Sequence, residues 1–338
     1  MKQHDKTNHQ GRRAAGFSAK HLRGVMLPFP TPFNQQGDVD HAALRANILK
    51  WNETGISGYV ALGSTGERVH LDEHERAAVI ETARECVPED LAFIVGAGQQ
   101  SVRGTFGEIR RAAELGADAV LVITPHFYRG AMTQGALFKY YAAVADEARV
   151  PVLLYSMPEL TGVGIAPETV ARLSEHENIA GIKDSSGDVI NLAETLRLVP
   201  EEFAVLTGNG ASFYAALAAG VRGAILAVGC VATRETLAIY EAVQRGEHER
   251  GRRLQESLTP LALAVTRRYG IGGLKAALDM IGYAGGYVRA PLEDASEDAR
   301  REIARLLEEA ALPVDEDAAD ETSTDDATLK DETEAARC

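Results

Sequence analysis

Residues 91–125 read LAFIVGAGQQSVRGTFGEIRRAAELGADAVLVITP, and this stretch decides the fold. An apolar run at Ala92–Val95 precedes an amphipathic stretch over 102–115, and a second apolar run follows at Ala119–Thr124. Ser101 suits a helix N-cap and Gly116 suits a helix C-cap, so the stretch predicts strand, helix, strand. Both strand runs are apolar throughout, which is typical of a parallel sheet covered on both faces.

The same unit recurs on both sides of this stretch. Asp72 precedes one of the predicted helices, Pro167 stands early in another, and Gly220 ends a third. Eight strands separated by helices predict a (β/α)8 TIM barrel, of class α/β. A doubly wound open sheet is the rival, but no GxGxxG follows the first strand. The predicted strands are Gly24–Phe29, Gly58–Leu62, Ala92–Val95, Ala119–Thr124, Val152–Ser156, Ala180–Lys183, Ala204–Thr207 and Ala224–Ala227; the predicted helices are 40–53, 72–86, 102–115, 134–147, 167–175, 188–197 and 211–219.

Further helical segments follow the eighth strand, near 233–245, 247–267, 273–281 and 297–311. They exceed what a barrel needs, so a C-terminal helical extension is expected. The 338 residues therefore divide into a barrel and flanking segments rather than two domains. We expect a flexible basic leader over 1–20, the barrel over 21–230, C-terminal helices packed on it over 231–312, and a disordered acidic tail over 313–338.

The net charge of −14 is unevenly placed. The tail carries ten acidic residues against two basic ones, and the leader carries a net of +4, which leaves −10 for residues 21–312. This balance argues against a nucleic-acid or anionic-membrane partner. No apolar run is long enough to span a membrane, and no signal peptide is expected. Three scattered cysteines fit a reducing compartment, so a cytoplasmic location is expected.

Polar residues at strand ends are the candidates for chemistry, because barrel enzymes react at the carboxyl ends of their strands. Lys183 ends the sixth predicted strand, inside an otherwise apolar run. Burial there favours the uncharged amine, a nucleophile for carbonyl carbon. The alternative is a structural salt bridge to Asp184 or to an acid of a neighbouring strand.

Two more strand ends carry hydroxyl groups. Ser64 and Thr65, between glycines, offer hydroxyl and backbone N–H groups that suit a small carboxylate, although a plain turn is equally compatible. Tyr155 ends the fifth strand as either a proton carrier or a packed rim residue. No metal-ligand spacing is present among the histidines, so neither a metal nor a cofactor is expected.

These residues resemble a known family. Gly63-Ser64-Thr65-Gly66-Glu67, Tyr155 in LYSMPELTG and Lys183 in GIKDSSGD are similar to the dihydrodipicolinate synthase / N-acetylneuraminate lyase superfamily of class I aldolases. The resemblance spans about residues 22–310. Within it, the segments TPHFYRGAM (124–132) and AVTRRYGIGGLK (264–275) look most like 4-hydroxy-2-oxoglutarate aldolases.

The resemblance implies roles for individual residues. Lys183 would form a Schiff base with the 2-keto carbon, Tyr155 would move protons, and Ser64 and Thr65 would hold the carboxylate. It also implies a homo-oligomer, commonly a tetramer. Three further residues complete the expected substrate-binding set: Ser185, Gly208 and Ile225.

The chain departs from the lysine-biosynthesis branch of this superfamily at two places. Leu160 stands where that branch has an arginine, which argues against aspartate semialdehyde as the acceptor. Phe127 stands where that branch has a relay tyrosine, and Tyr128 is a candidate replacement. Arg68 and Arg129 are candidate counter-ions for a second substrate carboxylate, with an exposed surface arginine as the alternative for each.

The resulting expectation is a cofactor-free lyase that cleaves 4-hydroxy-2-oxoglutarate to pyruvate and glyoxylate, or acts on a close 2-keto acid. The alternatives are a 2-keto-3-deoxy sugar-acid aldolase or dehydratase, and then 4-hydroxy-tetrahydrodipicolinate synthase. A barrel that binds a 2-keto acid without turnover is the alternative from a different class. A pyridoxal-phosphate barrel would also use a lysine imine.

Overall fold

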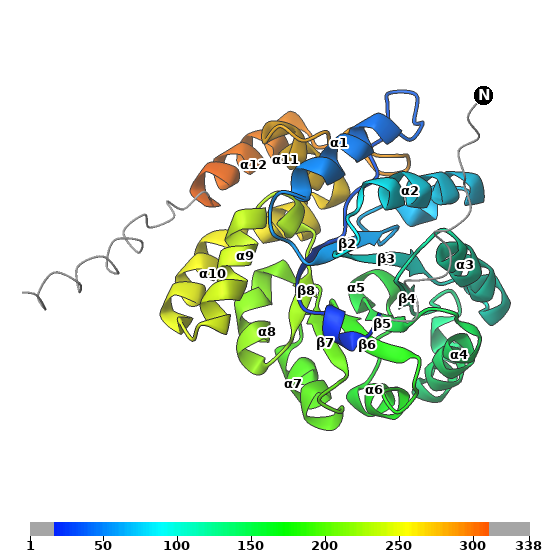
Figure 1. Ribbon diagram of the computed structural model, residues 1–338. Helices are drawn as coiled ribbons and strands as arrows, with labels where there is room; N and C mark the ends of the chain where they lie inside the picture. The colour runs from blue at the N-terminus through cyan, green and yellow to red at the C-terminus, as the bar shows by residue number, and fades with distance from the viewer. Residues whose placement is uncertain (1–16, 311–338) are drawn as a thin grey trace, which may run out of the picture.

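The computed structural model describes residues 17–310, which form a closed barrel of eight parallel strands in the order β1 to β8 (Figure 1). The first and last strands pair directly, with Gly24 beside Gly223, so the sheet has no free edge. The (β/α)8 fold expected from the sequence is confirmed. The strands are β1 Gly24–Leu27, β2 Gly58–Ala61, β3 Ala92–Ala97, β4 Ala119–Ile123, β5 Val152–Ser156, β6 Ile179–Asp184, β7 Ala204–Thr207 and β8 Gly223–Ile225.

Helices follow the strands and cover the outside of the barrel (Figure 1). The predicted start signals are confirmed: Ser101 accepts a hydrogen bond from the Gly104 amide, and Asp72 forms a capping box with Glu75. Gly220 ends its helix in the left-handed conformation, as a C-cap glycine does. The helices around the barrel are α1 His41–Trp51, α2 Glu73–Cys86, α3 Val102–Glu114, α4 Gln134–Glu147, α5 Pro158–Thr161, α6 Pro167–Leu173, α7 Val189–Leu198 and α8 Phe213–Ala219.

The C-terminal helices lie together on one side of the barrel, next to α1 (Figure 1). They are α9 Thr233–Gln244, α10 His248–Leu263, α11 Gly270–Met280 and α12 Glu297–Ala310. The segment predicted as one helix over 247–267 is α10 followed by a π-helical turn over Ala264–Arg268. Asn47 of α1 exchanges two hydrogen bonds with the backbone of Ala284, which ties the C-terminal segment to the first helix.

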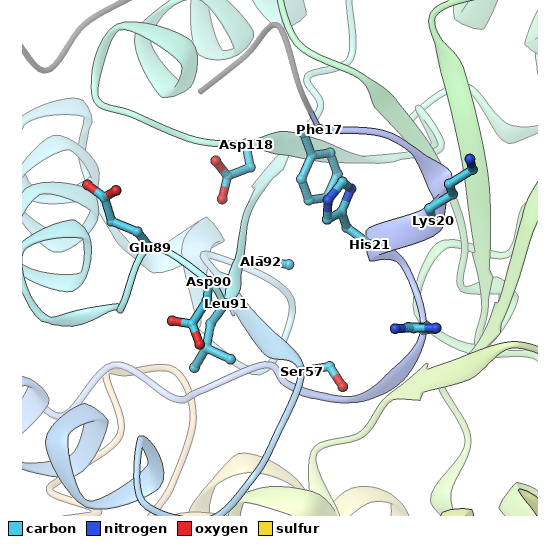
Figure 2. Close-up of a pocket in the computed structure, with 10 residues that line it drawn as sticks. Phe17, Lys20, His21, Ser57, Glu89, Asp90, Leu91, Ala92 and Asp118 are labelled. Carbon is cyan, nitrogen blue, oxygen red and sulfur yellow. The ribbon is translucent and has the colours of Figure 1, made fainter. Parts of the chain in front are cut away.

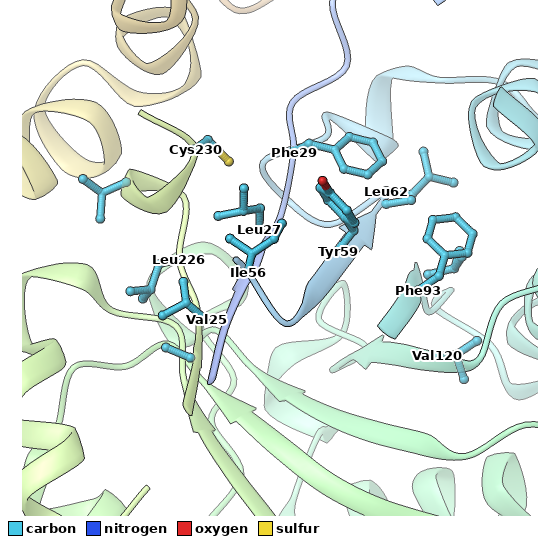
Figure 3. Close-up of a cluster of buried hydrophobic side chains, with 14 of the residues drawn as sticks. Val25, Leu27, Phe29, Ile56, Tyr59, Leu62, Phe93, Val120, Leu226 and Cys230 are labelled. Atoms are coloured by element: carbon cyan, nitrogen blue, oxygen red, sulfur yellow. The ribbon is translucent and has the colours of Figure 1, made fainter. Parts of the chain in front are cut away.

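Buried side chains form two layers, because successive residues of a strand point to opposite faces. Met26 of β1 packs inside the barrel with Leu153, Leu206 and other inward-facing side chains. Its neighbours Val25 and Leu27 point outward into the larger cluster between strands and helices, part of which Figure 3 shows. This packing fixes the direction of each side chain at the ends of the strands.

The N-terminal end of the barrel differs from one expectation. Residues 17–20, assigned above to a flexible leader, are part of the described structure: Ala19–His21 form a short 3-10 helix, and Phe17 stacks on His21 at 5.1 Å. A cavity of about 380 Å³ lies beside them, lined by Ser57, Ala92 and Asp118 (Figure 2). These residues lie at or just before the starts of β2, β3 and β4, whereas Lys183 lies near the carboxyl end of β6. The expectations for residues 1–16 and for the acidic tail at 313–338 fall outside the described residues. Within residues 17–310, no helix is long and apolar enough to cross a membrane.

Candidate active site

Lys183 lies near the carboxyl end of β6, between β5 and β7, and its side chain is buried with 5% of its surface exposed. The strand register pairs it with Tyr155, and its Nζ lies 4.6 Å from the centre of the Tyr155 ring. Among residues 17–310, no hydrogen bond or ion pair holds this amine. A buried lysine without an acidic partner is rare, because burial disfavours its charged form.

The structure contradicts the alternative that Lys183 serves as a salt bridge to Asp184. Asp184, the next residue of the strand, points the other way and accepts hydrogen bonds from the backbone and hydroxyl of Ser186, at 2.7 and 2.6 Å, and from Asn191 of α7 at 3.2 Å. Burial raises the pKa of the Asp184 carboxyl above its ordinary value. The Asp184 carboxylate therefore bonds to groups outside the barrel, whereas the Lys183 side chain faces the barrel interior.

Tyr155 connects the lysine with the loop that follows β2. Its side chain is 4% exposed, and its Oη lies 3.3 Å from the Ser64 hydroxyl. The structure thus brings together Ser64 from the loop after β2, Tyr155 from β5 and Lys183 from β6, as the strand-end argument predicts. A phenol between an amine and a second hydroxyl is suited to carry protons between them.

The loop after β2 supplies unused hydrogen-bond donors. It turns tightly, with the Gly66 amide donating to the Gly63 carbonyl at 3.0 Å and the Glu67 amide donating to Ser64 at 3.2 Å. Within the part of the chain described, the amides of Ser64 and Thr65 donate to no protein acceptor. Adjacent free amides beside two hydroxyls are a geometry that suits an anion such as a carboxylate.

Three more predicted site residues surround the lysine. Gly208, which follows β7, leaves room for its neighbours: a Cβ at this position would lie 1.9 Å from the Ser185 Oγ and 2.6 Å from the Lys183 Cε. Ser185 is buried with 6% of its surface exposed. Ile225 of β8 is fully buried in the interior cluster that also contains Tyr155.

Residues at the predicted departures lie at the surface. Leu160 of α5 is 62% exposed, and Phe127 and Tyr128 are 73% and 71% exposed in the loop after β4. The two aromatic rings pack edge to face against one another at 5.1 Å. Arg129 is also exposed, which agrees with the surface alternative considered for it.

For Arg68, the alternative of an exposed surface arginine is wrong. Its side chain is only 11% exposed, pairs with Glu108 at 2.6 Å and donates to the Gly98 carbonyl at 3.0 Å. Burial lowers the pKa of the Arg68 guanidinium. Glu108 already pairs with this guanidinium, which weakens the case for Arg68 as a counter-ion; the counter-ion roles of Arg68 and Arg129 stay predictions.

The sequence argument gave no role to Glu67 or Lys275, which form a buried ion pair at 2.6 Å behind the loop after β2. The sequence signal that singled out Lys183 was also present at Lys275, which interrupts the apolar segment Gly272–Leu278.

In residues 17–310, no three His, Cys, Asp or Glu side chains are grouped as a metal site would require.

Comparison with known proteins gives a consistent result. Residues 21–310 match the dihydrodipicolinate synthetase family. The chain is 35% identical to the 4-hydroxy-tetrahydrodipicolinate synthase of Methanothrix thermoacetophila over 287 residues, which cover 85% of this chain and 96% of that one. The enzyme of the same name from Thermodesulfovibrio yellowstonii is 33% identical over 292 residues, covering 86% and 99%.

Solved structures agree with the sequence relatives. A monomeric dihydrodipicolinate synthase variant superimposes with a TM-score of 0.83 at 30% identity, covering 87% of this chain and 99% of the other. The dihydrodipicolinate synthase of Thermotoga maritima superimposes with a TM-score of 0.81, also at 30% identity, covering 86% and 99%.

Proposed function

The chain belongs to the dihydrodipicolinate synthetase family, and from this premise we propose that it is a Schiff-base-forming class I aldolase that cleaves 4-hydroxy-2-oxoglutarate to pyruvate and glyoxylate. One observation carries the proposal: the Lys183 amine has no ionic partner within residues 17–310 and lies 4.6 Å from the ring centre of Tyr155, whose hydroxyl contacts Ser64. Such a pairing of a nucleophile with a proton carrier is the arrangement that imine chemistry needs.

The first step joins enzyme and substrate. The neutral amine of Lys183 attacks the C2 carbonyl carbon, a carbinolamine forms, and loss of water gives a protonated imine. Tyr155 lies next to the amine and can pass the required protons to and from the departing oxygen.

The second step breaks the C3–C4 bond. Tyr155 takes the proton of the C4 hydroxyl, the C4–O bond becomes the carbonyl of glyoxylate, and the bonding electrons move into the imine as an enamine. A proton then returns to C3, and water hydrolyses the imine to release pyruvate and free Lys183. Electron withdrawal by the iminium makes the carbon leaving group stable enough to form.

The C1 carboxylate fits the loop after β2. The Ser64 and Thr65 amides and the Thr65 hydroxyl make no other hydrogen bond among the described residues, so they are available to it. Ser64 would also link the carboxylate to Tyr155 through their 3.3 Å contact. Holding the carboxylate places C2 at a fixed distance from the amine.

A second candidate is 4-hydroxy-tetrahydrodipicolinate synthase, the name carried by the sequence relatives. That reaction uses the same imine of pyruvate but adds an aldehyde to the enamine instead of releasing one. The exposed Leu160, at the position where the resemblance leads us to expect an arginine, favours the cleavage reaction.

The decisive experiment is reduction with borohydride in the presence of pyruvate, followed by peptide mass spectrometry. We expect one pyruvyl adduct, on Lys183; an unmodified Lys183, or an adduct on another lysine only, would contradict the mechanism. Substrate choice is then measured as kcat/KM for cleavage of 4-hydroxy-2-oxoglutarate, for cleavage of six-carbon keto-deoxy acids, and for condensation of pyruvate with aspartate semialdehyde. A higher value for either of the last two would replace the proposed substrate.

A further inference from the structure

A buried ion pair lies behind the carboxylate-binding loop. Glu67, at the end of that loop, pairs with Lys275 of α11 at 2.6 Å, and each side chain is 1% exposed. The two residues are 208 positions apart in the sequence. The pair therefore joins the loop after β2 to the C-terminal helices across the interior of the protein.

Both charged groups have further partners. One Glu67 oxygen accepts from the Arg289 backbone amide at 3.1 Å and lies 3.2 Å from the His70 ring. Lys275 donates to the Tyr287 carbonyl at 2.5 Å and lies 4.5 Å from the centre of the Phe33 ring. The loop is consequently held from the C-terminal side by the segment that runs from Lys275 to Arg289.

The loop between these contacts has a strained backbone. Leu62 at its start and Glu67 at its end both have positive φ angles, of 55° and 52°, although neither is glycine. Such conformations persist only where the surroundings impose them, and they occur often at binding sites. Ser64 and Thr65, whose amides donate to no acceptor among the described residues, lie between these two residues.

We propose that Glu67 and Lys275 are positioning residues, which hold the loop in the one conformation that presents the Ser64 and Thr65 amides to the substrate carboxylate. This inference rests on the proposed function, because it assigns the loop to carboxylate binding. Stability alone does not require the pair, since apolar residues of similar volume often replace a buried ion pair without loss. The geometry of the Glu67–Lys275 ion pair, by contrast, fixes the position of Glu67 and therefore of the turn that precedes it.

Loss of one partner leaves the other charge buried without compensation. In Lys275→Met, we expect Glu67 to turn toward water. This movement relaxes the left-handed backbone of Glu67 and displaces the amide of Thr65, two residues earlier in the loop. Carboxylate binding then weakens, whereas Lys183 and Tyr155 on β6 and β5 keep their positions. We therefore expect the half-saturating substrate concentration to rise, whereas imine formation at saturating substrate should change little.

The test measures borohydride trapping of the full-length protein as a function of pyruvate concentration. For Lys275→Met we expect the half-saturating pyruvate concentration to rise at least tenfold, and trapping at saturation to stay within threefold of the wild type. Glu67→Gln keeps the shape of the side chain and is expected to show a smaller rise. The double variant should be no worse than Lys275→Met, because residues that act as a unit are not additive.

A matched control separates positioning from general loss of stability. Leu173→Ala creates a cavity in α6, away from the loop, and should lower the thermal unfolding temperature without raising the half-saturating concentration. Equal rises in Leu173→Ala and Lys275→Met, or an unchanged value in Lys275→Met, would overturn the positioning role.

Hydrogen exchange provides a readout that needs no substrate. Amides of residues 62–71 should exchange faster in Lys275→Met than in the wild type, and those of the loop at 124–133 should not change. If the wild type traps no pyruvate, the proposed function fails, and the exchange result still decides whether Lys275 holds the loop. Unchanged exchange over 62–71 would contradict the proposal on its own.

Discussion

Lys183 and Tyr155 are directly paired in the register of β6 and β5, with the lysine Nζ 4.6 Å from the centre of the phenol ring. The pairing makes their relative position a property of the strand backbone rather than of a loop. Strand pairing in a closed barrel tolerates little displacement, because every strand is hydrogen bonded on both sides. The proposed nucleophile and proton carrier are thus held by the most rigid part of the fold.

Replacing Lys183 by methionine should make the protein more stable and inactive. In the part of the chain that the structure describes, the buried amine has no ionic partner, so an apolar side chain of similar length removes the cost of burying a polar group. We expect the free energy of unfolding to rise by about 0.5–2 kcal/mol, the usual gain from a single stabilising substitution. Urea unfolding and borohydride trapping measure the two effects, and a variant that retains aldol cleavage would refute the assigned role of Lys183.

Tyr155→Phe removes the hydroxyl that contacts Ser64 but keeps the ring next to Lys183. Loss of a proton carrier typically lowers kcat by about 10²–10⁴-fold. Imine trapping at long incubation should still label Lys183, because the amine is unchanged. Tyr140→Phe, which removes a buried hydroxyl of α4 outside the site, is the control and should keep full kcat; an equal loss in both variants would show a structural effect only.

Gly208→Ala should impair the site through contact with its neighbours. The added Cβ would lie 1.9 Å from the Ser185 Oγ and 2.6 Å from the Lys183 Cε, which forces the lysine to move. Overpacking of this kind costs about 1–3 kcal/mol in stability, and we expect the rate of imine formation to fall at least tenfold. Gly107→Ala on α3 meets no atom within 4 Å and serves as the control. If borohydride traps Gly208→Ala as fast as the wild type, the predicted clash of the added Cβ with Ser185 and Lys183 is wrong.

The pair between Glu75 and Arg289 should make stability dependent on pH in the acid range. Two guanidinium hydrogen bonds of 2.7 Å hold the pKa of the Glu75 carboxyl below its ordinary value of 4.5. A lowered folded-state pKa contributes stability above pH 4.5, and this contribution is lost as the pH falls through the folded-state value.

Wild type and Glu75→Gln should therefore differ by about 1.5–3 kcal/mol at pH 7, the range for hydrogen bonds to charged groups. The difference should shrink as the pH decreases below 4.5. Urea unfolding at several pH values between 7 and 3 measures it, and a difference that does not depend on pH would exclude the carboxylate as its source.

Most of the barrel was predictable because each strand is a short apolar run that ends at a polar or glycine residue. The predicted strand Ala204–Thr207 is identical to β7, and Gly58–Leu62 exceeds β2 by one residue. Local capping residues such as Ser101 placed the helices for the same reason. Short-range patterns carry this information without reference to the rest of the chain.

Features that depend on distant residues could not be predicted in this way. The burial of Arg68 follows from its pairing with Glu108 on a different helix, and an arginine in a polar loop gives no local sign of that. Likewise, the sequence could not decide whether Lys183 pairs with Asp184, because the hydrogen bonds from Ser186 and Asn191 that occupy Asp184 are visible only in the structure. The strand alternation predicts opposite directions for the two side chains, but the partners come from tertiary structure.

The contacts of the C-terminal segment with the first helix and with the loop after β2 join residues that are synthesised at very different times. Asn47 and Ala284 are 237 residues apart, and Glu67 and Arg289 are 222 apart. At typical rates of translation the ribosome needs roughly 10–50 s to synthesise such a span. The loop proposed to bind the carboxylate is thus among the first parts of the barrel to emerge, and the residues that hold its shape are among the last. A nascent chain halted before Lys275 would contain all of β6, including Lys183, while the loop after β2 would still lack both Lys275 and Arg289.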